Sequence, residues 1–242
     1  MEAFLLLPIE LQKYETYLFQ TQNDPTGTLV TSDKPVSVVA CDNYEYLKTG
    51  TDYGYRVEQV LPTRFYDFKL IVPTISPRDD YYIRIFSVYD DTNMYNSTTH
   101  DSHFLKRLEL FEHRFMVEPT LLLDDKPIYV MIYSTIIFMM TAQAMSQFQS
   151  EYESTLQSFT SAYIIAVTIK TADMSEIYLD CNKNGINNTK AIQVASPLQD
   201  YSVLYIPITG TTIHRIHQSR QQKFGAVLLN PAIAMLTEGL YG

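Results

Sequence analysis

The chain has 242 residues, a formal net charge of −9, 19 tyrosines and no tryptophan. Its length permits a substantial buried core, and its modest glycine and proline content excludes a disordered or collagen-like chain. The negative charge argues against non-specific binding to nucleic acid and against docking on an anionic membrane surface. We therefore expect a folded protein with no nucleic-acid partner.

Short strand patterns and turn signals begin near the N-terminus. An aromatic segment, 14–19, predicts a strand, and Asp24-Pro25-Thr26-Gly27 predicts a type I turn. After a polar break at 32–34, Val36, Val38 and Ala40 alternate with Ser37 and Val39. That period is typical of a half-buried strand.

An internal repeat is visible farther along the chain. The segment 33–38 (DKPVSV) recurs at 125–130 (DKPIYV), and aromatic strands at 14–19 and 111–115 precede the two copies. Strands predicted at 81–86 and 163–169 follow the copies, and a fainter third copy is expected at 201–230. The unit is too long for a solenoid repeat.

The predicted fold is all-β, with two related antiparallel β-sandwich-like halves packed together. The halves are expected at 1–95 and 103–242, with the faint third copy completing the second, and 91–103 is predicted as a turn-rich boundary loop. The apolar run 128–140 is too short to span a bilayer, so it predicts a buried strand pair and no membrane insertion. At most a short helix is expected near 141–159.

The N-terminal motifs carry a resemblance to a known family. They are Thr26-Gly27-Thr28, Ser32, Lys34-Pro35-Val36, Val38, Val57-Glu58-Gln59 and Leu61-Pro62. In order and spacing they resemble the N-terminal (IgGFc-binding) domain of the IgG Fc-binding protein family, most clearly over residues 10–90. The residues expected to have the family's structural or binding roles are Gly27, Lys34, Pro35, Val36, Val57, Glu58, Gln59 and Pro62.

The resemblance implies a non-enzymatic, extracellular and secreted binding or adhesion module, since family members form parts of mucus-associated proteins. It implies protein or glycoprotein partners, mucin-like or immunoglobulin-like, and no cofactor. No signal peptide is visible, so we expect a truncated or mis-started sequence or a fragment of a longer protein, and the alternative is an intracellular protein. The alternative is a carbohydrate-binding, lectin-like sandwich, which could depend on Ca²⁺.

Within the motif, Glu58 and Gln59 are predicted to be structural, as a polar pair that closes a loop onto a strand edge. A buried carboxylate needs a partner, and Arg56 or Arg64 is close enough in sequence to provide one.

Histidines and acidic turns are the candidate metal ligands. His100 and His103, like His214 and His217, are spaced three apart and would share the face of a helix. They fall in a loop and near a strand, however, so exposed loop or edge histidines are favoured and no metal site is predicted. The segments 90–93 and 180–185 carry oxygens suited to Ca²⁺, but turns are favoured for both.

The sequence carries few other motifs of catalytic, modification or thiol sites. The chain lacks a nucleophile elbow, a phosphate loop and a zinc-protease helix, so no catalytic residue is predicted. The acidic pairs 79–80 and 124–125 are interpreted as turn residues. Two sequons in predicted loops place N-glycosylation at Asn96 and Asn187. Cys41 and Cys181 are expected to be free, buried thiols, and the alternative is a disulfide between the two.

Overall fold

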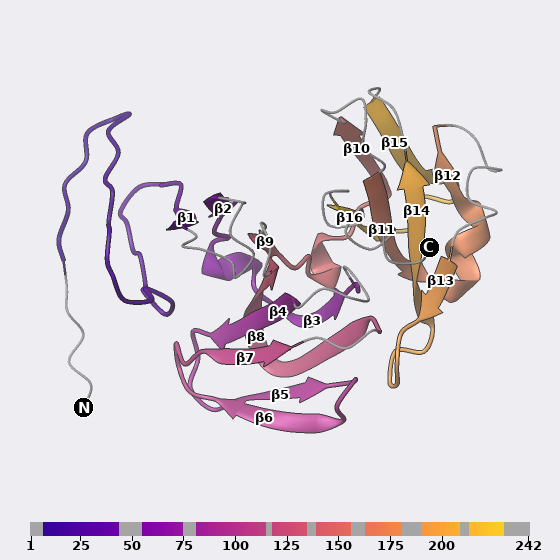
Figure 1. Cartoon of the computed structure of the whole chain (residues 1–242), viewed down its shortest axis with the longest axis horizontal. Helices are drawn as coiled ribbons and strands as arrows, with labels where there is room; N and C mark the ends of the chain where they lie inside the picture. The colour runs from indigo at the N-terminus through magenta and orange to yellow at the C-terminus, as the bar shows by residue number, and fades with distance from the viewer. Residues whose placement is uncertain are drawn as a thin grey trace, which may run out of the picture.

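The protein is built from antiparallel β-strands, which confirms the all-β prediction (Figure 1). A computed structural model describes residues 7–43, 55–74, 81–114, 118–134, 139–155, 163–180, 190–208 and 213–229. Within this part of the chain the helical elements are three 3₁₀ turns, and no helix is long and apolar enough to span a membrane.

The largest unit is a seven-stranded sheet, here called the first sheet. Its strands are β3 (Asp67–Val72), β4 (Tyr81–Ser87), β5 (Thr92–Asn96), β6 (Asp101–Leu105), β7 (Phe111–Arg114), β8 (Thr120–Ser134) and β9 (Met139–Thr141). The order is β6-β5-β8-β4-β7, and β3 and β9 also pair with the 15-residue β8. The β8–β9 pair confirms the strand pair predicted within 128–140.

Two smaller sheets form a sandwich in the C-terminal half. The four-stranded sheet has the order β13 (Lys190–Gln193), β14 (Tyr201–Ile208), β11 (Tyr163–Lys170), β16 (Gly225–Leu229). The three-stranded sheet has the order β10 (Glu151–Thr155), β15 (Ile213–Gln218), β12 (Ile177–Leu179).

The three sheets stack as layers, with the four-stranded sheet in the middle. One core joins its Ala166 and Val203 to Ile83 and Leu121 of the first sheet. A second core joins its Val167 and other residues to the three-stranded sheet. Because both faces of β11 are covered, the strand has a nearly continuous apolar sequence instead of an alternating one.

The helix expected near 141–159 is reduced to one 3₁₀ turn, η2 (Met145–Gln147), followed by β10. The other two 3₁₀ turns are η1 (Thr63–Phe65) and η3 (Thr171–Glu176). Around η2, Ala142, Ala144 and Phe148 are buried in the core, and the Gln147 side chain accepts a hydrogen bond from the Ala144 N–H. Packing of these buried residues in the core replaces the longer helix.

The predicted N-terminal strands are largely wrong. Residues 7–38, here called the arm, contain no strand, and β1 (Val39–Asn43) begins only where the predicted strand should end. It pairs with β2 (Tyr55–Gln59) in a separate two-stranded sheet. The two copies of the DKP repeat therefore differ in structure, since 33–38 lies in the arm and 125–130 within β8. In β8 the proline lies beside an irregularity in the pairing with β3, where a missing N–H is tolerated.

The stretch predicted as a boundary loop is a hairpin. Residues 92–96 and 101–105 form β5 and β6, so the loop prediction for 91–103 is wrong. Since β5 also pairs with β8, the first sheet joins residues from both sides of the expected boundary between 1–95 and 103–242.

Candidate functional site

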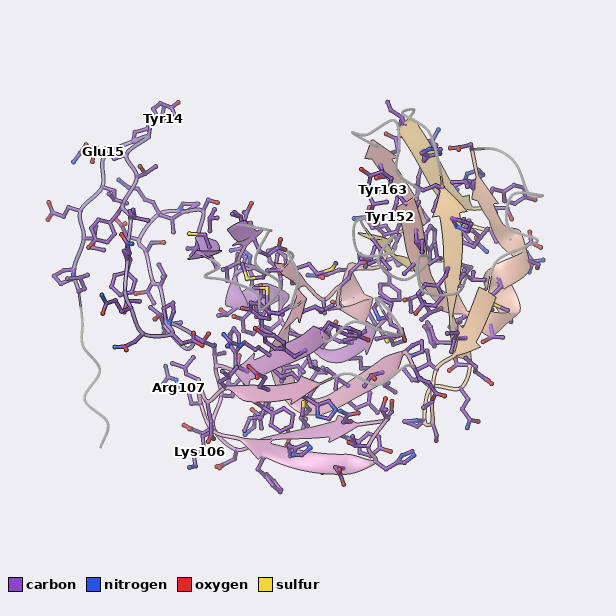
Figure 2. The ribbon with its side chains drawn as sticks, viewed as in Figure 1. Tyr14, Glu15, Lys106, Arg107, Tyr152 and Tyr163 are labelled. Atoms are coloured by element: carbon purple, nitrogen blue, oxygen red, sulfur yellow. The ribbon has the colours of Figure 1, made fainter. Side chains whose placement is uncertain are left out.

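The arm carries most of the exposed large apolar side chains of the described residues. They include Leu7, Ile9, Leu11, Tyr14, Tyr17, Leu18, Phe19, Leu29, Val30 and Val36. Tyr14 is 90 % exposed and Leu18 75 % exposed, and Tyr14 lies with Glu15 at the end of the arm that is far from the first sheet (Figure 2). Exposed apolar surface of this extent is typical of an interaction site.

The Thr26-Gly27-Thr28 motif fixes the arm to the first sheet through a tight turn. The Thr28 N–H donates to the Pro25 carbonyl at 3.0 Å, and Gly27 has φ = 90°. The turn is therefore shifted by one residue from the predicted Asp24–Gly27 and needs positive φ at its third position, as in type II. A Cβ atom on Gly27 would lie 2.8 Å from the Leu108 carbonyl oxygen, so only glycine fits this contact.

Arg84 of β4 holds the same turn electrostatically. Its Nη1 lies 2.8 Å from Asp24 Oδ2, and its Nε donates to Glu112 Oε2 at 3.0 Å. The guanidinium also lies 5.0 Å from the Tyr133 ring centroid. Burial acts to raise the pKa of Asp24, but hydrogen bonds from Thr26 and the charge of Arg84 outweigh it and lower the pKa. Asp24 is thus held as the carboxylate.

The Val57-Glu58-Gln59 motif lies in β2, beside the outer face of the first sheet. Glu58 Oε1 accepts a hydrogen bond from the Thr141 N–H of β9 at 3.1 Å. Glu58 thus contacts the edge of β9 through a hydrogen bond, and a structural role for this residue would require such a contact. Arg64, one of the two predicted charge partners of Glu58, instead lies over the Phe65 ring. The side chain of Arg56, the other predicted partner, is outside the part of the chain that the structure describes.

The other motif residues do not converge on a pocket. The C-terminal part of the arm, next to β1, carries the exposed residues Lys34, Pro35 and Val36. Strand β2 carries the exposed Val57 and Gln59, and Pro62 precedes η1. The motif therefore brings Gly27 to Leu108 and Glu58 to β9, and leaves its remaining side chains on the surface.

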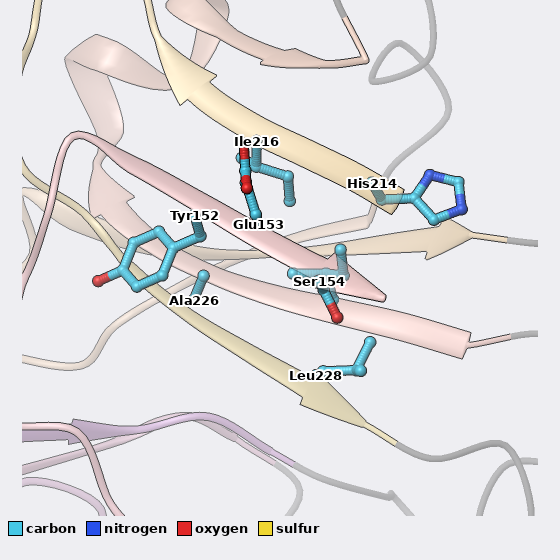
Figure 3. Close-up of a pocket in the computed structure, with 8 residues that line it drawn as sticks. Tyr152, Glu153, Ser154, His214, Ile216, Ala226 and Leu228 are labelled. Atoms are coloured by element: carbon cyan, nitrogen blue, oxygen red, sulfur yellow. The ribbon is translucent and has the colours of Figure 1, made fainter. Parts of the chain in front are cut away.

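A small cavity of about 140 Å³ lies in the C-terminal sandwich, between the edge strands β10 and β16. Figure 3 shows side chains that line it, among them Tyr152 and Ser154 from β10, Ile216 from β15 and Leu228 from β16. At one end, Gln149 and Phe224 close the gap between the two strands through paired backbone hydrogen bonds.

His214 of β15 also lines this cavity, and the sequence prediction of an exposed edge histidine is wrong for it. Its side chain is only 9 % exposed, and its Nδ1 lies 2.7 Å from Asp180 Oδ2. Its Nε2 is buried and has no hydrogen-bond partner, so it makes no hydrogen bond with Ser154 Oγ. The Asp180–His214 pair was not predicted, because 34 residues separate its members.

The other histidines have structural neighbours. His100 is exposed and its Nδ1 lies 3.0 Å from the Tyr95 hydroxyl, as expected for a loop histidine. The His103 ring packs 4.3 Å from Phe111, and the His217 ring stacks on Tyr178. Among the described residues, no group of three His, Cys, Asp or Glu side chains is arranged to hold a metal ion.

The two acidic turns are used as turns. Lys126 Nζ donates to the Asp90 and Asp91 carbonyls, and Asp125 Oδ1 accepts from the Asn93 N–H at 2.7 Å. Asp180 has φ = 52°, and its Oδ1 accepts from the Arg215 N–H at 2.8 Å. The rest of the second turn, 181–185, lies outside the described residues.

The predicted glycosylation and thiol sites need correction. Asn96 is fully buried in β5, and its amide nitrogen is inaccessible, so this sequon is not a surface site. Cys41 is free but exposed, on the short β1–β2 sheet, where a buried thiol was expected. Asn187 and Cys181 lie outside the described residues.

Comparison with known proteins gives one match. The sequence profile of the family described as IgGFc binding protein matches residues 6–229. No curated protein matches the chain. No solved structure matches it either.

Proposed function

Because the chain belongs to the IgGFc binding protein family, we propose that it is an extracellular, non-enzymatic module that binds a protein or glycoprotein partner through its arm. The family consists of binding domains. Mucin-like glycoproteins are the proposed partners, in keeping with the resemblance of the motifs to mucus-associated proteins.

The exposed apolar side chains of the arm are the observation that carries this proposal. Burying apolar area is the main favourable contribution to protein association, at about 25 cal/mol per Å² removed from water. Aromatic anchors such as Tyr14 and Phe19 are also the residue types that dominate interface energetics. The arm therefore offers a surface that gains free energy when a partner covers it.

The attachment of the arm favours binding as well. The Gly27 turn and the Asp24–Arg84 ion pair hold its middle against the first sheet, and β1 continues its end. A segment that is already held in place loses less conformational entropy on binding than a free tail does. Gly27, one of the family motif residues, thus supports the binding surface through its close contact with Leu108.

The experiment measures binding of the purified chain to a mucin film and to the same mucin stripped of its glycans. Leu18→Asp should weaken binding to both films about tenfold or more, because the variant loses buried apolar area and places a carboxylate in the interface. Phe104→Asp is the matched control, since Phe104 is 77 % exposed on β6, away from the arm. It should bind like the wild type.

Three results would contradict the proposal. Absence of binding to either film would remove mucin as the partner. Equal loss in Leu18→Asp and Phe104→Asp would remove the arm as the surface. Loss of wild-type binding on glycan removal would instead favour the lectin-like alternative, and a repeat with a chelator would then test its dependence on Ca²⁺.

A further inference from the structure

The cavity between β10 and β16 lies apart from the arm and has walls of mixed character. Ile165, Ile216 and Leu228 provide apolar surface, and the Tyr152 ring provides an aromatic wall. The polar groups at this cavity include Ser154 and His214, which lie directly opposite each other on paired strands. Side chains opposite each other on one face of an antiparallel pair are close neighbours, so both lie on the inner face of the sandwich.

The hydrogen bonding of His214 determines what its free nitrogen can accept. With Nδ1 bound to the Asp180 carboxylate, the proton of the neutral ring is on Nδ1. Nε2 is then an acceptor with a lone pair, and it is buried without a partner. Buried polar groups in folded proteins are normally paired, so this nitrogen is suited to a donor that enters from outside the chain.

The volume of the cavity limits the size of that donor. An apolar cavity of about 150 Å³ can hold benzene, and this one measures about 140 Å³. One aromatic ring is therefore a group of a size that this cavity can hold, and the Tyr152 ring would contact it at its edge or face.

We propose that this cavity binds a small phenolic group, with its ring between Ile216 and Leu228 and its hydroxyl donating to His214 Nε2. The group could be a free phenol or the tyrosine side chain of a peptide, since both present the same chemistry. This site is independent of the arm and of the partner proposed for it.

The test is an NMR titration of the full chain with phenol, with toluene and with N-acetyltyrosinamide, following the ¹⁵N resonance of His214 Nε2. Phenol should bind at least tenfold more tightly than toluene and should shift this resonance. Binding of N-acetyltyrosinamide as well would extend the site to peptides, and its failure to bind would restrict the site to free phenols. Equal affinity for phenol and toluene, or no binding of either, would overturn the proposal.

Variants locate the site. Leu228→Phe fills the cavity from a partly exposed edge position and should abolish phenol binding, and Ala226→Leu is a second filler should the first fail to fold. Ile213→Phe is the matched control, because Ile213 is 63 % exposed and precedes His214 on the opposite face of β15. Unchanged phenol binding in a folded filler variant would overturn the site. Mucin binding by the arm is measured separately, so either proposal can fail alone.

Discussion

Gly27 is the residue on which the attachment of the arm depends most directly. Alanine there combines strain from the positive φ with a clash against the Leu108 carbonyl, and strain of this kind costs about 1–3 kcal/mol. In Gly27→Ala the arm should detach, and chymotrypsin should cleave after Leu29, which follows the turn in the arm, about tenfold faster. Thr31→Ala, an exposed arm substitution, is the control. Equal cleavage rates in the two variants would show that the turn does not hold the arm.

Asp124 should make the stability of the fold depend on pH. Burial, together with the neighbouring charge of Asp125, raises the pKa of Asp124 to about 8, and neither carboxylate oxygen has a hydrogen-bond partner. An aspartate in the unfolded chain titrates near pH 4. The folded state therefore binds the proton more tightly, so the contribution is fully present below about pH 4 and is lost as the pH rises through 8.

Asp124→Asn tests this dependence, because the amide cannot ionise. At pH 9 the variant should be more stable than the wild type by about 1–3 kcal/mol, and at pH 4 the two should be equal. Urea unfolding at pH 4, 7 and 9 measures the difference. Asp125→Asn, which alters an exposed carboxylate, should leave most of the slope in place. A wild-type slope that persists in Asp124→Asn would refute the assignment.

At the scale of elements, Asp180 ties the end of β12 to β15. Its two carboxylate oxygens contact the Arg215 N–H and His214 Nδ1, and its own N–H donates to the Arg215 carbonyl. Asp180→Ala should lower the free energy of unfolding by about 1–3 kcal/mol, because a buried imidazole loses its partner. Asp180→Asn keeps the turn geometry and one acceptor, so it should lose less. Urea midpoints would decide, and two equal losses would contradict the stabilising role of the Asp180 hydrogen bonds.

Strands that bury a regular pattern of apolar residues were predictable from the sequence. Strands that bury polar residues were not. β4, β11 and β14 were predictable because Ile and Val mark their inner faces. The β5–β6 hairpin was missed because the buried residues of β5 include Thr92 and Asn96, which are polar and add nothing to an apolar pattern. The Thr92 hydroxyl donates to Ser87 Oγ, and Asn96 Oδ1 accepts from the Thr98 N–H. The arm has the alternation of a strand, but a strand also needs a partner, and local pattern carries no information about one.

The candidate sites were predictable to a smaller extent. The family motifs identified Gly27 and Glu58, but their contacts with Leu108 and Thr141 depend on residues about 80 positions away. Arg84 and the Asp180–His214 pair had no local signal at all. Contacts of this separation follow from strand order, which single-sequence patterns do not determine.

For the whole molecule, the first sheet predicts that the chain does not divide at residues 95–103. Fragments 1–95 and 103–242 would each carry unpaired strands, because β5 and β4 of one fragment pair with β8 of the other. We expect each fragment to be unfolded or aggregated alone, and the full chain to unfold in one transition. Circular dichroism of the two fragments tests this, and two folded fragments would restore the predicted division.

The position of β11 between two cores has a consequence for the evolution of the family. Alternate residues of this strand pack against different sheets, since Ala166 packs toward the first sheet and Val167 toward the three-stranded sheet. Residues on the two faces of β11 should therefore covary with different sets of positions. In an alignment of relatives, changes at 166 should covary with positions in β4 and β8, and changes at 167 with positions in β12 and β15.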